Sequence, residues 1–371
     1  MLIQGKSLNA ETLTDVTQKA TSDARKQFAE AFDLLRPLPA REGTMHIYVF
    51  VPKVAPDRPI GGVKMLYRHV DVLNKHGFSA SIILHEGDTR NKWFHSDTPI
   101  RFLKDRFITK SDILVLPEIL GPLLAEYGKG VSKVIYNQSA YLSFLGYPLL
   151  GIEHPSPYRN DEVVATIVCS ENSREYLQYT FPGLTLFRIR HSIDSHTFTY
   201  NPVKKKQVCF MPRKSREDLT QVINILRGRG SLTGYEVIPI DRVSHEVMVQ
   251  VMRDSLIFLS GGTAEGFGLP PAEAMACGCI VIGYHGGGGR EYFHPDWCYP
   301  IEAGDVVTFA RTVENVIHLN EVAPYELYRK GIQAASFIRD NYTENREESD
   351  IVETWNSIIS RHSIRSPKLG K

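Results

Sequence analysis

The sequence predicts an α/β protein built from two doubly wound domains, each with a parallel sheet between layers of helices. Two observations support this prediction. Apolar runs of strand length alternate with amphipathic helical segments, and this alternation pauses and then resumes near residue 200. At 371 residues the chain is also long enough for two separate cores.

Composition excludes several classes of protein. A net charge of +1 gives no electrostatic footprint for nucleic acid. Five cysteines, an odd number without a C-x-x-C pair, argue against a disulfide framework and a zinc site. The first 30 residues lack the apolar core of a signal peptide, and no run approaches a membrane span. We expect a cytoplasmic protein. The sequence leaves two questions open: whether the protein associates peripherally with the inner face of the plasma membrane, and what its oligomeric state is.

A proline and a basic run at 198–206 read as a linker between the two blocks. The predicted parts are an N-terminal helical extension, an N-terminal domain, a C-terminal domain and a C-terminal helix with a tail: 1–43, 44–200, 201–345 and 346–371. The extension reads as an amphipathic helix around 20–35.

The N-terminal domain begins with a strand, a Gly61-Gly62 turn and a helix over 64–75. Its strands are predicted at 45–51, 79–84, 113–117, 133–138 and 163–169. The glycine pair lets the backbone approach a ligand closely, although such a pair serves a tight turn just as often. Ser170 follows the last of these strands as a helix cap.

Polar side chains follow two of these strands. Because functional groups of such sheets gather at the carboxyl ends of strands, we expect four side chains to point toward a crevice. They are Glu118, Asn137, Gln138 and Tyr141. The alternative for each of these residues is that it is an ordinary polar loop residue with no ligand.

The C-terminal domain repeats the alternation of strands and helices. Strands are predicted from 208 and at 235–240, 256–260 and 279–283, and helices at 217–226, 245–252, 305–319, 325–337 and 344–359. A second glycine-rich turn, 285–291, follows the strand at 279–283 and opens a helix.

The candidate site is the stretch 265–273, which joins the strands at 256–260 and 279–283. It forms a glycine-bearing loop and a short helix, the geometry in which α/β proteins hold phosphates. Two prolines suit the first helical turn, because its N–H groups have no partner inside the helix. The amides of Phe267, Gly268 and Leu269 are therefore expected to donate to an anion.

Glu265 and Glu273 stand at the two ends of this stretch. A carboxylate accepts two hydrogen bonds side by side, which suits the vicinal hydroxyls of a sugar ring. A site that offers backbone amides to phosphate groups, between two carboxylates that accept hydrogen bonds from hydroxyls, is typical of a nucleotide-sugar site. The alternative is that Glu273 only complements the helix dipole and Glu265 is a solvated loop residue.

Other motifs are absent. The chain has no D-x-D, so a carboxylate pair holding a metal with a nucleotide has no support, and we expect no metal. It also has no H-E-x-x-H, no G-x-S-x-G and no G-x-G-x-x-G after the first strand.

The two blocks, the first Gly-Gly turn and the two glutamates resemble the GT-B fold, and more narrowly the retaining glycosyltransferase family 4. The stretch from Glu265 to Gly278 is similar to that family's signature. The resemblance implies two Rossmann-like domains facing each other across a cleft. It implies that Glu265 holds hydroxyls of the donor sugar, Glu273 the ribose or deoxyribose, and the amides of 267–269 the diphosphate.

The resemblance also implies that Arg213 and Lys214 neutralise the leaving diphosphate, and that Gly61 and Gly62 approach it from the first domain. Such charge stabilisation suits a site with no metal and no cofactor. Asn137 and Gln138 stand where several members carry a histidine. Because an amide is no general base, the leaving phosphate would take the acceptor proton.

The implied function is a retaining glycosyltransferase that moves a sugar to a cell-surface polysaccharide or glycolipid acceptor. The stretch from Gly61 to Lys64 and the Asn137-Gln138 strand end resemble those of rhamnosyltransferases of this family, so dTDP-rhamnose is the expected donor. Alternatives are a GT-B-like sugar-nucleotide epimerase, a phosphorylase, or a catalytically silent subunit of a glycan-assembly system.

Overall fold

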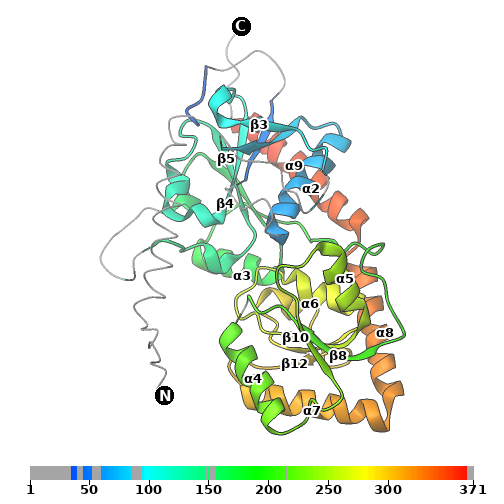
Figure 1. Ribbon diagram of the computed structural model, residues 1–371. Coiled ribbons are helices and arrows are strands. Elements are labelled where there is room, and N and C mark those ends of the chain that lie inside the picture. Colours follow the sequence, from blue (N-terminus) through cyan, green and yellow to red (C-terminus); the bar gives the residue numbers. More distant parts are fainter. Residues whose placement is uncertain are drawn as a thin grey trace, which may run out of the picture.

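Two parallel sheets organise the protein into two lobes, one above the other in Figure 1. The computed structural model describes residues 35–39, 45–51, 60–85, 94, 96–147, 149, 156–213 and 215–365. The predicted α/β class with two doubly wound units is confirmed.

The first lobe holds a seven-stranded sheet in the order β3-β2-β1-β4-β5-β6-β7, parallel throughout. Its strands are β1 (Ile47–Phe50), β2 (Ala80–Leu84), β3 (Ile100–Phe102), β4 (Ile113–Pro117), β5 (Ser132–Asn137), β6 (Val163–Val168) and β7 (Leu186–Arg188). Its helical segments are α2 (Gly61–Lys75), η1 (Leu103–Asp105), η2 (Glu118–Ala125), η3 (Ala140–Leu142), η4 (Pro157–Arg159) and α3 (Glu171–Thr180). The strand order reverses between β1 and β4, the position at which open α/β sheets bind ligands.

The second lobe holds a five-stranded parallel sheet in the order β12-β11-β10-β8-β9. Its strands are β8 (Lys205–Phe210), β9 (Glu236–Pro239), β10 (Ser255–Ser260), β11 (Ile280–Gly283) and β12 (Tyr299–Pro300). Its helical segments are α4 (Arg216–Gly228), α5 (His245–Asp254), α6 (Leu269–Ala276), η5 (Gly288–Glu291), α7 (Val306–Val322) and α8 (Pro324–Asn341).

Long elements match their predicted positions, whereas β3, β7 and β12 were not predicted. These three strands have two or three residues each and no fully buried run. Too short to show a period, they exist because they add to the edges of sheets that are already formed.

The chain passes from one lobe to the other before the predicted boundary at residue 200. Ile189 packs in the core of the first lobe, and Ile193 packs in the core of the second. The predicted linker belongs to the second lobe, because Phe198 lies in that core and Lys204 Nζ donates to the carbonyl oxygens of Arg253 and Cys277.

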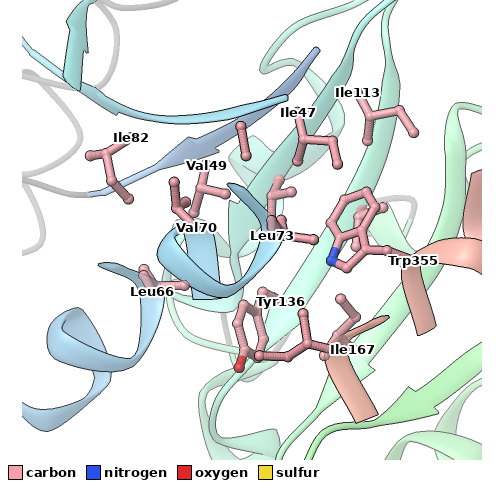
Figure 2. Packing of buried hydrophobic residues seen from close by; sticks show 14 of the residues in the cluster. Ile47, Val49, Leu66, Val70, Leu73, Ile82, Ile113, Tyr136, Ile167 and Trp355 are labelled. Carbon is pink, nitrogen blue, oxygen red and sulfur yellow. The ribbon is translucent and has the colours of Figure 1, made fainter. Parts of the chain in front are cut away.

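The last helix, α9 (Glu344–Arg365), returns to the first lobe and lies beside α2 (Figure 1). Its Trp355 is fully buried among residues such as Ile47, Leu73 and Ile113 (Figure 2). The C-terminal helix predicted as a separate part therefore completes the core of the first lobe.

Most of the predicted N-terminal extension lies outside the described residues. At its end, Leu35 is fully buried in the first lobe, and the amide of Leu38 donates to the carbonyl oxygen of Ile108. None of the helices in the described ranges is long and apolar enough to cross a membrane.

Candidate functional site

The loop that follows β10 is paired with the glycine-rich turn that follows β11. The amide of Glu265 donates to the carbonyl oxygen of Gly286 at 2.7 Å, and the amide of Gly288 donates to the carbonyl oxygen of Glu265 at 3.0 Å. A Cβ at Gly286 would stand 2.8 Å from Cγ of Glu265, and Gly286 has a φ of +64°. Glycine is therefore required there for steric and conformational reasons.

Tyr292 determines which way the loop's peptide groups face. Its hydroxyl lies 3.0 Å from the carbonyl oxygen of Phe267 and 2.5 Å from that of Gly268. Because a trans peptide points its carbonyl and its N–H in opposite directions, the N–H groups of Gly268 and Leu269 face away from Tyr292. They stand at the start of α6, where the helix dipole favours an anion.

Phe267 differs from its two neighbours. Its side chain is buried, with ring-centroid distances of 5.8 Å to His191, 5.2 Å to Tyr292 and 5.1 Å to Tyr342. Its amide nitrogen lies 2.7 Å from where a Cβ on Gly288 would stand. Of the three predicted amides, those of Gly268 and Leu269 are therefore the better placed for a diphosphate.

The two glutamates occupy different environments within the second lobe. Oε1 of Glu265 lies 2.7 Å from the position that a Cβ on Gly262 would take, so this half-buried carboxylate rests against a glycine. Glu273 lies in the first two turns of α6. Burial raises the pKa of Glu273 to about 7, and the positive charge of Lys64 in the first lobe opposes that rise.

The Gly61-Gly62 pair, predicted as a turn, forms the first two residues of α2 and meets the loop of the second lobe. A Cβ at Gly61 would stand 2.8 Å from Cδ1 of Leu269. The side-chain amide of Gln138 donates to the carbonyl oxygen of Gly62 at 2.9 Å. A Cβ at Gly266 would stand 1.6 Å from the backbone oxygen of Gln138, so the lobes touch where glycine leaves room.

Two of the four side chains expected at the crevice have other roles. Asn137 is fully buried and donates to Ser143 Oγ at 2.9 Å and to the Tyr158 hydroxyl at 2.6 Å. Glu118 is buried and accepts the amide N–H of Ser139 at 3.0 Å, while burial raises its pKa to about 7. The expectation that both face a crevice is wrong, because each satisfies polar groups inside the first lobe.

Tyr141 and Gln138 do lie at the boundary between the lobes. The Tyr141 hydroxyl donates to Asn172 Oδ1 at 2.9 Å, and it would stand only 1.9 Å from a Cβ at Gly287. Tyr141 therefore packs against the glycine-rich turn of the second lobe.

The basic pair is described in part. Arg213 is exposed in the turn between β8 and α4, and Lys214 lies outside the described residues. Arg213 is thus at the carboxyl end of a central strand of the second sheet, the edge that also carries the loops after β10 and β11.

Lys64 was missed at the sequence level. Its charge acts on Glu273 of α6, on Asp194 at the crossing between lobes, and on His245 at the start of α5. One signal was available, because a lysine in the first turn of a helix opposes the helix dipole.

Within the described ranges, no group of three or more His, Cys, Asp or Glu side chains could hold a metal ion.

Comparison with protein families places one match on the second lobe. Residues 232–335, which include the loop and both glutamates, match the family model described as glycosyl transferases group 1. The chain is 25% identical over 241 residues to an alpha-1,6-glucosyltransferase of Actinobacillus pleuropneumoniae serotype 7 (strain AP76), covering 61% of this chain and 69% of the relative.

Two solved structures share the fold over most of the chain. Sucrose-phosphate synthase from Thermosynechococcus elongatus has a TM-score of 0.62 at 12% identity, over 85% of this chain and 100% of that one. The pneumococcal O-GlcNAc transferase GtfA, solved with UDP and GlcNAc, has a TM-score of 0.60 at 12% identity, over 86% and 99%. At such identity the likeness concerns the fold.

Proposed function

We propose that this chain, a glycosyltransferase with the GT-B fold, moves a hexose from a nucleoside-diphosphate sugar to a saccharide acceptor with retention of configuration. The observation that supports this most is the meeting of Gly61 with Leu269. Because Gly61 begins α2 and Leu269 begins α6, the starts of these two helices lie side by side at the boundary between the lobes. Two helix N-termini together suit a diphosphate.

The residues around that point have complementary roles in this proposal. The amides of Gly268 and Leu269 bind the diphosphate, and Glu273 accepts hydrogen bonds from the ribose hydroxyls. Glu265 accepts from the donor sugar. Arg213 and Lys214 stabilise the charge of the leaving diphosphate, so the site needs neither a metal ion nor a cofactor.

The reaction requires little acid–base chemistry from the protein. The acceptor hydroxyl forms a bond to the anomeric carbon on the face from which the diphosphate departs, as the glycosyl–phosphate bond breaks. The leaving phosphate oxygen takes the hydroxyl proton. Gln138, whose side-chain amide donates to the carbonyl oxygen of Gly62, positions the start of α2 and transfers no proton.

For the donor, glucose takes precedence over the rhamnose that the sequence suggested. The relative that aligns over 61% of this chain is a glucosyltransferase. The rhamnosyltransferase resemblance depends on the stretch from Gly61 to Lys64 and on the Asn137-Gln138 strand end, and Asn137 is fully buried. The acceptor is proposed to be a cell-surface polysaccharide or glycolipid bound by the first lobe, with the reaction proposed to occur at the cytoplasmic face of the membrane.

The test is acceptor-dependent release of nucleoside diphosphate from UDP-glucose, GDP-mannose, ADP-glucose and dTDP-rhamnose, with and without EDTA. We expect one donor to be consumed only when an acceptor from a panel of glycans is present, with the same rate in EDTA. Turnover without acceptor would favour an epimerase. Nucleotide binding without transfer across the panel would favour a silent subunit.

Glu265→Gln supplies the residue-level test. The substitution removes the negative charge and replaces one hydrogen-bond acceptor of the carboxylate with a donor. Its turnover should fall at least about 100-fold, in the range of losing one transition-state contact. Glu326→Gln on the exposed face of α8 is the matched control and should retain full activity.

A further inference from the structure

We propose that Glu291 is a positioning residue that bonds across the boundary between the lobes. It holds the first lobe against the loop between β10 and α6, here called the donor loop. Glu291 ends η5, directly after the glycine-rich turn of the second lobe. Its catalytic consequence depends on the proposed function, whereas its effect on lobe arrangement does not.

Both oxygens of the Glu291 carboxylate bind groups of the first lobe. Oε2 accepts the amide N–H of Glu171 at 3.0 Å, and Oε1 accepts Nη2 of Arg188 at 2.7 Å. Oε1 also accepts the hydroxyl of Tyr342, which ends α8, at 3.0 Å. Three donors from three elements thus converge on one side chain.

The environment strengthens these bonds. The side chains of Glu291 and Arg188 are only 15% and 27% exposed, so water screens the ion pair less than at an open surface. Glu171 is the first residue of α3, and a carboxylate at that end of a helix complements the dipole. The bond from Arg188 is charge-assisted.

The next residue along the chain connects this contact to the donor loop. Tyr292 directs its hydroxyl at the carbonyl oxygens of Phe267 and Gly268, which orients the amides proposed to bind the diphosphate. Consecutive residues therefore bind the first lobe and the donor loop. A change in how the lobes meet is transmitted to the loop through one peptide unit.

A second contact between the lobes lies beside the one that Glu291 makes. The turn before Glu291 reaches the first lobe at Gly287, where a Cβ would stand 1.9 Å from the Tyr141 hydroxyl and 2.8 Å from Asn172 Oδ1. Since Asn172 follows Glu171 in α3, the start of this helix contacts the second lobe at both Gly287 and Glu291. Glu291 supplies the charge in this contact.

The experiment compares Glu291→Gln, Arg188→Gln and the double variant with the wild type and with Glu326→Gln. If Glu291 favours the lobe arrangement that binds donor, its loss lowers the population of that arrangement and raises the apparent KM by the same factor. We expect the donor KM to rise about tenfold and kcat to stay within about twofold. The double variant should be no worse than either single variant, because the two residues act as a pair.

A readout that needs no turnover separates this inference from the proposed function. Small-angle scattering of each protein without donor should give a larger radius of gyration for Glu291→Gln and Arg188→Gln than for Glu326→Gln. Unchanged scattering, or an unchanged donor KM in a variant that turns over, overturns the role of Glu291. If the wild type turns over no donor, the proposed function fails and scattering alone decides the inference.

Discussion

Trp355 donates its indole N–H to Nε2 of His69 at 2.7 Å, inside the core of the first lobe. The two residues are 286 positions apart, on α9 and α2. Burial lowers the pKa of His69 to about 4, with the charge of His191 acting in the same direction and that of Glu347 opposing it. The imidazole is therefore neutral near pH 7 and can accept the bond.

Trp355→Ala should lower the free energy of unfolding of the first lobe by about 3–5 kcal/mol, because it opens a cavity in a packed core. Trp355→Phe keeps an aromatic ring but leaves Nε2 of His69 without its donor, at a cost of about 1–3 kcal/mol. Urea unfolding followed by circular dichroism measures both changes. If the Ala variant lost less stability than the Phe variant, α9 would not be part of this core.

Glu347 of α9 makes the stability of the contact between α9 and α2 depend on pH. Burial alone would raise the pKa of Glu347, but His191, whose Nδ1 lies 3.9 Å from Oε1 of Glu347, and the charge of Arg68 lower it to about 2. A lowered carboxyl pKa contributes stability above its ordinary value of 4.5, and that stability is lost as pH falls toward 2. The shift corresponds to at most about 3 kcal/mol.

We therefore expect Glu347→Gln to be less stable than the wild type at pH 7 and to have a flatter stability profile between pH 5 and pH 3. Urea midpoints across that range test this expectation. Glu353→Gln, an exposed change on the same helix, should follow the wild-type profile. Parallel profiles for Glu347→Gln and the wild type would show that the carboxylate makes no such contribution.

Glu273 should make donor binding depend on pH near neutrality. Its pKa of about 7 means that half of the molecules carry a protonated carboxyl at that pH before donor binds. Since ribose hydroxyls need an acceptor, the donor KM should rise as pH falls from 8 to 6. Glu273→Gln should have a higher KM at pH 8 and lose this dependence, whereas an unchanged dependence would assign it to another group such as Glu118.

Among the glycines that the structure describes, Gly266 is the one at which an added methyl group, as in Gly266→Ala, should damage the contact between the lobes most. Its Cβ would stand 1.6 Å from the backbone oxygen of Gln138, which cannot move like a side chain. We expect kcat/KM to fall about 100-fold, the effect of a misplacement of about 1 Å. Gly228→Ala has open space around it and should leave kcat/KM unchanged. Equal activity of both variants would contradict the close approach.

Much of the second lobe was predictable because its signals are local. The apolar run of β10, the glycines of the loop and the two prolines of α6 occur within one short stretch, and each has its own steric meaning. The same holds for Ser170, predicted as a helix cap, whose Oγ accepts the amide of Ser173. Strand ends were less reliable guides, because Asn137 and Glu118 satisfy buried backbone and side-chain groups instead of facing a ligand.

By itself, the sequence determined the two alternating α/β blocks and the loop and short helix from Glu265 to Glu273, since apolar periodicity and glycine sterics act between near neighbours. Only the tertiary structure decided that α9 completes the first lobe, that Gly266 touches Gln138, and that Glu291 bonds to Arg188. These pairs are far apart in sequence and leave no local pattern. They depend on how elements distant in the chain pack together, so only the three-dimensional structure reveals them.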